Sequence, residues 1–528
     1  MRRTLRTASA LAFLVLALLA SACAPSATAT PTPAGPTDVP LTSVEVIRST
    51  NMSQSYSDTL FTDFVKEKFK LDLRYTYYPS STFQEKLSLS FSTNSYGDVL
   101  ELVDSAIINR YSKDGFFQPL EGIIDSKLPN YRKAYSDEDW AFLLSSMSDA
   151  EGRLYALPVR MATGSTGSNI FFYRSAQFEK AGAKVPTTVE ELYDGLMAIK
   201  TKINPNVTIP NQWGLANVYS GFDCAFRTQN VVWKDPDAGG QLVYGPITDK
   251  FRDLLIYMNK LYESGLLAKE FSTMSDEQFW SEYSAGNTYF CWRYPGFHNK
   301  KLNGLLTAAK IEPDWEYDLD NLLLSAYADK GPLQQRYGTF YTATVAITDK
   351  LEADATALVL SYFDWSCTEE GQLFHEFGVE GETYEVAGDG IPSFIGKYSD
   401  ATDTNKLGSY YGNLQDFGPF GYFLVENEAH ANKFYPEYKE SNAALKDFEY
   451  MDLFVPIPYR FSQAEETRQA ELYVVVDSVS KEYQLSFIVG TKDPGSDADW
   501  NEYIGKMEKA GIDEYMQLLR DANARTIK

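Results

Sequence analysis

The chain has 528 residues, of which 44% are hydrophobic and 14% aromatic. It carries 72 acidic against 48 basic side chains, so its formal net charge is −24 and its surface repels nucleic acid, which we exclude as a partner. A chain of this length exceeds what one hydrophobic core organises and indicates two or more lobes.

Residues 1–22 read as a secretory signal peptide, in which Arg2, Arg3 and Arg6 precede an apolar run at 11–20. Small residues lead directly to Cys23, which is the signature of a bacterial lipoprotein. The thiol of Cys23 then takes a lipid such as palmitate, the chain is cut before it, and the protein stays anchored on the extracytoplasmic face of the cell membrane. A plain signal peptide with a chance cysteine is the alternative. A retained transmembrane helix needs roughly 20 apolar residues, more than this run offers.

Residues 23–40 are rich in proline, threonine and alanine and have almost nothing to bury, so they predict a flexible tether. The body that follows contains Cys224, Cys291 and Cys367, an odd number at wide spacing from which no disulfide pairing follows. The three histidines of the chain form no zinc-binding pattern. We therefore expect no metal site and no cofactor.

The body opens with alternating strands and helices. The hydrophobic pattern predicts a strand at 44–47, a helix at 54–69, a strand at 72–78, a helix at 82–91 and a strand at 96–102. This βαβ series indicates an α/β fold with a parallel sheet.

Ligands of parallel sheets bind beyond the carboxyl ends of the strands. Asn51, Met52 and Tyr56 follow the first predicted strand, and Glu101 and Asp104 lie at the end of the third. We take these five as candidate ligand-binding residues, with a turn or capping role as the alternative for each.

Further along the chain, an extended segment ends at Arg160 and a strand follows at 169–174. A helix begins after Thr187 and Thr188, either of which can cap it, because glutamates stand three residues further on.

Several short motifs occur in an order that resembles the extracellular solute-binding proteins of the maltodextrin-binding type, the receptor halves of ABC importers. They are GDV at 97–99, GFFQPL at 115–120, GRLYALP at 152–158, PTTVEEL at 186–192, YESGLL at 262–267 and GNTYFCW at 286–292. Nearer the C-terminus, EEG at 369–371, FGVEGETY at 377–384, FIVG at 487–490 and DWNEY at 499–503 resemble the long, lipid-anchored LipO-like branch of this family. The resemblance covers residues 41–528.

This resemblance implies a two-lobed periplasmic-binding-protein-like fold of type II, with a cleft and a hinge between the lobes. Crossings between the lobes are expected near 160–167, 292–295 and 339–345. Lobe one would then comprise 41–160 plus 293–340, and lobe two 165–290 plus 346–528. The implied function is that of a monomeric receptor, not an enzyme, which captures an oligosaccharide in the cleft and delivers it to ABC permease subunits in the membrane.

The aromatic surplus favours a sugar ligand, because the C–H faces of sugar rings pack on aromatic planes. The aromatic candidates near the expected crossings are Trp292 and Tyr341, and those in loops are Trp213, Tyr219, Trp233 and Tyr411. For each of them, packing in the core is the alternative.

Arg160 and Arg293 each follow an extended crossover segment and complete the set of candidates. If both face the cleft, they would hold a carboxylate and favour a uronic oligosaccharide. The alternative is an interlobe ion pair with Glu101 or Asp104.

The region at 204–211, where some relatives carry a calcium loop, lacks the acidic ligands that calcium needs. A receptor for a non-sugar solute such as a peptide is the alternative function. A secreted carbohydrate-active enzyme is a more distant one, because no motif places two carboxylates across a sugar.

Overall fold

The computed structural model describes residues 40–50, 60–79, 82–149, 151–160, 169–212, 214–293, 295, 297–337, 340–386, 388–396, 436–453 and 457–526. Separate sets of buried side chains organise the part of the chain from Leu41 onward. We call the body around the five-stranded sheet lobe one (described residues of 41–160 and 340–396). The body around the largest core is lobe two (described residues of 169–337 and 436–526).

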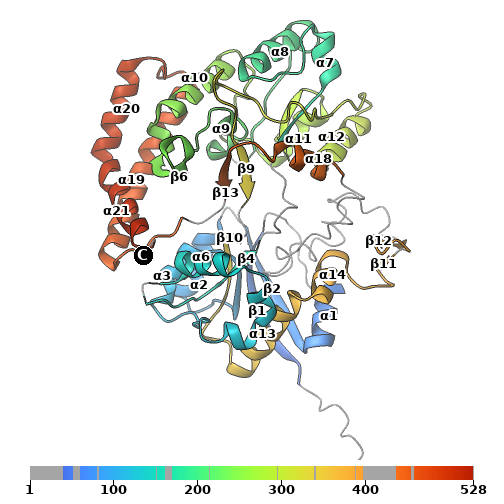
Figure 1. The fold of residues 1–528 in the computed structure, drawn as a ribbon, viewed down its shortest axis with the longest axis vertical. Helices are drawn as coiled ribbons and strands as arrows, with labels where there is room; N and C mark the ends of the chain where they lie inside the picture. Colours follow the sequence, from blue (N-terminus) through green and yellow to red (C-terminus); the bar gives the residue numbers. More distant parts are fainter. Residues whose placement is uncertain are drawn as a thin grey trace, which may run out of the picture. The chain divides into compact units, whose positions relative to one another are not determined.

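Lobe one is built on a sheet with the strand order β2-β1-β3-β10-β4 (Figure 1). Its strands are β1 (Thr42–Thr50), β2 (Leu71–Pro79), β3 (Val99–Asp104), β4 (Leu157–Arg160) and β10 (Phe340–Ile347). Strand β1 pairs in parallel with β2 and β3, whereas β10 runs antiparallel to β3 and β4. The predicted parallel sheet is confirmed for the first three strands, and β10 joins it from far along the chain.

Helices cover both faces of this sheet, because neighbouring residues of a strand point to opposite sides. Val44 and Val46 of β1 share a core with Phe61, whereas Ile47 shares another core with Phe83. Figure 1 accordingly shows α1 and α13 on one side of the sheet and α2 and α3 on the other. The helices of lobe one are α1 (Leu60–Phe69), α2 (Phe83–Ser92), α3 (Ser105–Ser112), α4 (Ile124–Lys127), α5 (Pro129–Lys133), α6 (Asp137–Met147), α13 (Ala353–Ser366) and α14 (Glu369–Phe377), followed by the hairpin of β11 (Tyr384–Val386) and β12 (Pro392–Phe394).

The strands of lobe two pair two by two. They are β5 (Ile170–Tyr173) with β8 (Phe290–Arg293), β6 (Val232–Asp235) with β7 (Gln241–Tyr244), and β9 (Gln334–Tyr337) with β13 (Tyr450–Leu453). The helices are α7 (Ser175–Lys180), α8 (Val189–Lys202), α9 (Phe222–Ala225), α10 (Asp249–Glu263), α11 (Asp276–Ser284), α12 (Phe297–Ala308), α18 (Pro436–Leu445), α19 (Gln463–Ile488), α20 (Asp497–Ala510) and α21 (Ile512–Ala524). Figure 1 shows α19, α20 and α21 packed together. Among the described helices, none is both long and apolar enough to cross a membrane.

Helix α8 illustrates how the local sequence sets an element of lobe two. The Oγ1 of Thr188 accepts the backbone N–H of Glu191 at 3.2 Å, and the carboxylate of Glu191 accepts the backbone N–H of Thr187 at 2.9 Å. The predicted threonine cap is therefore confirmed. Leu192 and Leu196 then follow on one helical face and are buried in the core of lobe two.

The structure divides the chain between the lobes differently from the expectation in two segments. Residues 297–333 were expected in lobe one, but Leu302, Trp315 and Leu324 pack in the core of lobe two. Residues 346–394 were expected in lobe two, but Leu351 and Phe363 pack in the core beside β10 of lobe one. The crossing expected near 292–295 therefore does not lead into lobe one, since α12 stays in lobe two.

Candidate functional site

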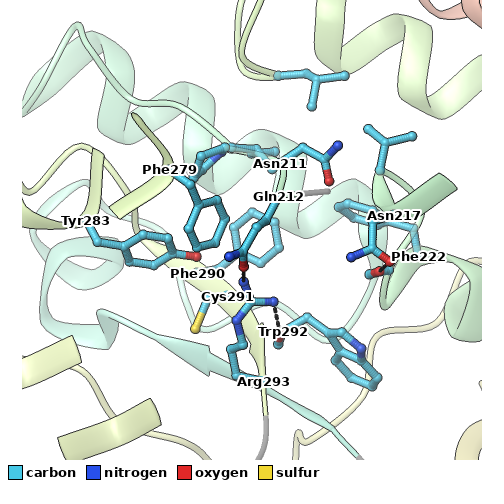
Figure 2. Close-up of a pocket in the computed structure, with 15 residues that line it drawn as sticks. Asn211, Gln212, Asn217, Phe222, Phe279, Tyr283, Phe290, Cys291, Trp292 and Arg293 are labelled. Carbon is cyan, nitrogen blue, oxygen red and sulfur yellow. Dashed lines mark hydrogen bonds between the residues drawn. The ribbon is translucent and has the colours of Figure 1, made fainter. Parts of the chain in front are cut away.

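The candidate site lies at the carboxyl end of β8 in lobe two. Strand β8 pairs antiparallel with β5, so Trp292 stands opposite Phe171 and Arg293 opposite Ile170. The strand is buried until Arg293, which is partly exposed. The motif at 286–292 thus ends where the chain leaves the core, and its last side chain borders a pocket (Figure 2).

The pocket combines an aromatic wall with several polar side chains. It encloses about 530 Å³ of space not filled by atoms, part of it open to solvent. The aromatic wall consists of Phe222, Phe279, Tyr283, Phe290 and Trp292. The side chains with polar groups are Asn211, Gln212, Asn217, Ser220 and Arg293.

Arg293 brings a positive charge to this pocket. Its Nη1 donates to the backbone oxygen of Trp292 at 3.1 Å, and its Nη2 donates to Oε1 of Gln212 at 3.2 Å. Its guanidinium lies 5.0 Å from the ring centroid of Phe279. Both acceptors are neutral, and no carboxylate of the described residues forms an ion pair with Arg293 within 4.0 Å. Because a guanidinium has five N–H donors, further donors and the charge itself are available to a ligand.

Gln212 is held in place on its far side. Its Nε2 donates to Oδ1 of Asp276 at 2.9 Å, which leaves Oε1 turned towards Arg293. Asp276 is the first residue of α11, and a capping box of Ser275 and Gln278 fixes the start of this helix. Figure 2 shows the side chains of Gln212 and Arg293 meeting at the pocket. The series Asp276–Gln212–Arg293 therefore orients the cation before a ligand arrives.

Trp292 is packed into the wall of the pocket. Its ring lies 4.6 Å from that of Phe171, and Gly221 approaches so closely that a Cβ there would lie 2.8 Å from the indole. Gly221 also has φ of +85°, so backbone conformation and close approach both require glycine. Phe171 and Gly221 thus cover part of the indole, and the predicted contact of Trp292 with a sugar stays a prediction. The indole N–H is buried without a hydrogen-bond partner in the described structure.

The aromatic wall is uncharged at neutral pH. Burial raises the pKa of the Cys291 thiol to about 12 and raises the pKa of the neighbouring Tyr283 hydroxyl above its usual value. Cys224, Cys291 and Cys367 are all free thiols. No cluster of histidine, cysteine, aspartate or glutamate suited to a metal ion occurs among the described residues. The charge that this pocket offers a ligand is that of Arg293.

Asp223 lies beside the pocket wall, at the start of α9. Its Oδ1 accepts the backbone N–H groups of Gly221 at 2.9 Å and of Cys224 at 2.8 Å. Burial raises the pKa of this carboxyl from 3.8 to about 6, although both hydrogen bonds act in the opposite direction. At neutral pH the fold therefore carries a partly buried negative charge next to its candidate site.

We expect Asp223→Asn to stabilise the protein near neutral pH. The folded state binds the Asp223 proton more tightly than the unfolded state, so this group's contribution is full below pH 3.8 and is lost as the pH rises through about 6. At about 1.4 kcal/mol for each pKa unit, the shift sets an upper limit of about 3 kcal/mol. Asparagine keeps the acceptor oxygen but has no charge to bury.

Thermal unfolding of both proteins between about pH 4.5 and about pH 7.5 checks this, with the exposed Asp114→Asn as control. The gain should grow with pH. A variant that is no more stable than wild type at the upper end would contradict the expectation.

In lobe one, the candidate Glu101 is part of the sheet rather than an open ligand group. It is buried, forms an ion pair with Arg48 at 3.0 Å and accepts the hydroxyl of Tyr75 at 3.4 Å. Asp104 and Arg160 are the last residues of β3 and β4, and their backbones pair with β10 at Ala343 and Phe340. Because β3 and β4 both run opposite to β10, these two strand ends lie at the same edge of the sheet.

The other candidates divide into two groups. The side chains of Asp104, Arg160 and Tyr341 lie outside the described part of the structure, as do the residues Cys23, Asn51, Met52, Tyr56, Trp213 and Tyr411. Tyr219 and Trp233 are described, and both are buried in the core of lobe two. The hydroxyl of Tyr219 donates to Oε1 of Gln484 at 2.9 Å. Neither lines this pocket, and their predicted contact with a ligand stays a prediction.

Of the described candidates, Trp292 and Arg293 are the two that line this pocket. Gln212 and Asn217, which also line the pocket, are ordinary polar residues of a loop and were not predicted from the sequence. The signal available for them was their place in a loop rich in aromatic residues, where Gln212 directly precedes Trp213 and Asn217 lies between Trp213 and Tyr219.

Comparison with known proteins assigns the chain to a family. The sequence profile of the bacterial extracellular solute-binding proteins matches residues 50–372. The polygalacturonan/rhamnogalacturonan-binding protein YtcQ of Bacillus subtilis (strain 168) is 21% identical over 483 residues, which cover 87% of this chain and 88% of that protein. Lipoprotein LipO of the same strain is 21% identical over 476 residues, with coverages of 84% and 85%.

Solved structures share the fold. The crystal structure of the alginate-binding protein AlgQ2 without calcium ion matches with a TM-score of 0.71 and 17% identity, covering 92% of this chain and 99% of that one. The Streptococcus pneumoniae substrate-binding protein FusA in complex with kestose matches with a TM-score of 0.70 and 15% identity, with the same coverages. The likeness at these identities concerns the fold, and it confirms the expected periplasmic-binding-protein fold.

Proposed function

Since the chain belongs to the family of bacterial extracellular solute-binding proteins, we propose that it captures an oligosaccharide between its lobes and delivers it to the permease of an ABC importer. Proteins of this family are transport receptors rather than enzymes. A ligand that touches both lobes draws them together by hinge bending, and the closed form then presents one joint surface to the permease.

The observation that carries the choice of ligand is the charge of Arg293, which pairs with no carboxylate of the described residues. Its guanidinium is oriented by neutral acceptors, with Asn217 and Ser220 nearby as further hydrogen-bonding groups of the pocket. A carboxylate would find both a counter-charge and a planar pair of donors there. We therefore propose an oligosaccharide with at least one uronic unit, placed at Arg293.

Lobe one would supply the second half of this site. The ends of β3 and β4 stand at one edge of its sheet, which is where parallel sheets bind their ligands. Asp104 and Arg160 stand at those ends. In the proposal, Arg160 adds a second guanidinium for an acidic sugar when the lobes close.

The relatives support this ligand class. The name of YtcQ records binding of polygalacturonan and rhamnogalacturonan, and that of AlgQ2 records binding of alginate. FusA, in contrast, is a fructooligosaccharide receptor. All three of these proteins bind sugars, but some of the sugars are acidic and others neutral. The relatives therefore do not distinguish an acidic from a neutral ligand, and the charge of the pocket is the basis for proposing an acidic one.

We also propose that Cys23 carries a lipid and that residues 24–40 tether the body to the membrane. Support comes from the small residues before Cys23 and from the relative named lipoprotein LipO. Anchoring keeps the receptor close to its permease and raises its effective concentration there.

Calorimetric titration of the purified protein tests the proposal, with oligogalacturonates and oligoalginates as acidic probes and with fructo- and xylo-oligosaccharides as neutral probes of matched length. We expect acidic probes to bind at least about tenfold more tightly, an advantage that shrinks with added salt. Binding of neutral probes alone would overturn the uronic ligand. Binding of peptides and of no sugar would overturn the oligosaccharide itself.

A further inference from the structure

A second hollow borders lobe two and shares no lining residue with the candidate site. It encloses about 1430 Å³ of space not filled by atoms, part of it open to solvent. Strand β6 and the turn that leads into β13 supply most of its wall, and Phe142 of α6 adds a side chain from lobe one.

Two hydrogen-bond donors in the wall of this hollow have no acceptor. Gln229 is 8% exposed and Trp233 is 4% exposed, and both residues line the hollow. The Nε2 of Gln229 and the Nε1 of Trp233 find no hydrogen-bond partner in the described structure. Buried donors are nearly always satisfied, because leaving one unpaired is costly. A ligand with acceptor oxygens would supply what these two groups lack.

The rim of the hollow is aromatic and open. Phe448 is 38% exposed and Tyr450 is 43% exposed, and both belong to the wall. Large apolar side chains on an otherwise polar surface commonly mark a binding site. Sugar rings offer the matching chemistry, since they carry apolar C–H faces together with hydroxyl oxygens that accept hydrogen bonds.

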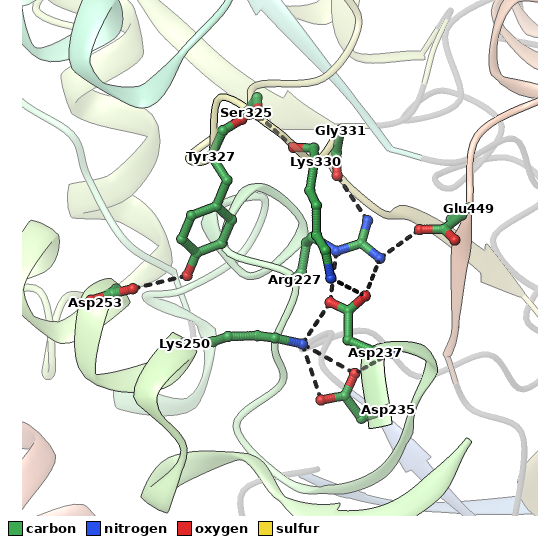
Figure 3. A network of polar contacts seen from close by, with 10 residues as sticks. All are labelled: Arg227, Asp235, Asp237, Lys250, Asp253, Ser325, Tyr327, Lys330, Gly331 and Glu449. Carbon is green, nitrogen blue, oxygen red and sulfur yellow. Dashed lines mark hydrogen bonds and ion pairs between the residues drawn. The ribbon is translucent and has the colours of Figure 1, made fainter. Parts of the chain in front are cut away.

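Salt bridges hold this wall in place and leave it nearly neutral. Figure 3 shows Glu449 turned towards Arg227, whose Nη2 donates to its carboxylate at 2.5 Å, so that charge is compensated. Arg227 also donates to Asp237, which lies between β6 and β7. It thereby connects the β6–β7 hairpin to the turn before β13. The remaining charged wall residues, Lys234 and Asp447, have opposite signs. The hollow therefore offers a ligand no net charge.

We propose that this hollow is a second saccharide-binding site, which takes a neutral oligosaccharide segment. Hydroxyl oxygens of the sugar accept from Gln229 and Trp233 after a small adjustment of the wall, and a sugar ring packs against Phe448 or Tyr450. Because Phe142 lies on the opposite lobe, a sugar bound here touches both lobes at a place separate from Arg293.

Saturation-transfer NMR of the full protein tests this, with cellohexaose, xylohexaose and maltohexaose as neutral probes. The test variant is Phe448→Ala/Tyr450→Ala, which changes exposed rings and spares the core. Tyr473→Ala is its control, because Tyr473 is similarly exposed on α19. Trp233→Phe keeps the ring in the core and removes the indole N–H. Arg293→Gln reports separately on the candidate site.

We expect at least one hexasaccharide to bind wild type and Tyr473→Ala equally, and to bind the double variant about fivefold more weakly, the effect of one lost aromatic contact. Trp233→Phe should weaken binding as well, while Arg293→Gln should not. The site would be refuted if no hexasaccharide binds wild type, or if the double variant binds as well as wild type. Loss of the neutral probe in Arg293→Gln would place it in the candidate site and refute the second one. The titration with acidic probes is a separate measurement, so either proposal can fail without the other.

Discussion

Exchanging Arg293 for glutamine should weaken the binding of an acidic oligosaccharide by about 100-fold, since truncating one partner of a desolvated charge pair costs several kcal/mol. Glutamine keeps the polarity and much of the length of the side chain but removes its charge and its pair of parallel donors. Arg293→Lys keeps the charge without the planar geometry and should fall between the two. Calorimetric titration with an oligogalacturonate measures all three proteins.

The fold should tolerate these changes, because Arg293 is partly exposed and donates to neutral acceptors. A melting temperature close to that of wild type is therefore part of the expected result. Arg132→Gln is the matched control, since its guanidinium also lies over an aromatic ring, 5.0 Å from that of Trp140, but on lobe one. An Arg293→Gln protein that binds acidic probes like wild type would leave the uronic ligand without support.

Replacing Arg227 with alanine should lower the free energy of unfolding by about 3 kcal/mol, the lower end of what breaking a buried ion pair costs. The side chain is 3% exposed and donates to Asp237, to Glu449 and to the backbone oxygen of Gly331 (Figure 3). Lys250 and Lys330 also bind Asp237, so its carboxylate keeps partners in the variant. Denaturation by urea at neutral pH measures the effect.

Lys330→Ala is the matched control for this network. Lys330 donates to the same carboxylate but is 50% exposed, so its loss should cost less than about 1 kcal/mol. The hydrogen bond from Arg227 is the main cause that holds the pKa of Asp237 well below 3.8. Its stabilising effect is therefore present above pH 3.8 and is lost as the pH falls towards the folded-state pKa. In Arg227→Ala the folded-state pKa of Asp237 lies closer to 3.8, so this carboxylate contributes less stability and the acid-dependent loss of that contribution is smaller than in Lys330→Ala. Equal acid-dependent losses in both variants would contradict this role.

Local patterns in the sequence were sufficient for the first half of lobe one. Strands β1, β2 and β3 lie close to the predicted ranges because their alternation and the amphipathic helices between them are set by neighbouring residues. The lobe boundaries were not predictable in this way. Strand β10 pairs with β3 and β4, which lie far from it in the sequence. The hydrophobic pattern of a strand does not indicate which sheet the strand will join.

The site was predictable only in part, for a related reason. Trp292 and Arg293 end an extended segment, which a sequence motif locates well. Tyr219 and Trp233 stand among glycines and polar residues that suggested an open loop, yet both fold into the core. Gly221, with its φ of +85°, illustrates how a glycine-rich segment can serve close packing instead of exposure. Asp276 and Gln212, which orient Arg293, meet through tertiary structure alone.

The position of β10 also bears on how this protein reaches its native state. Arg160 and Phe340 pair as neighbours, although the first long segment of lobe two lies between them in the chain. Lobe two in turn needs Phe487 and Trp500 from near the C-terminus to complete its core. Contacts so distant in sequence form slowly, because the loops that they close are long. The cores of lobe one are complete without the C-terminal helices, whereas the core of lobe two has to wait for α19 and α20.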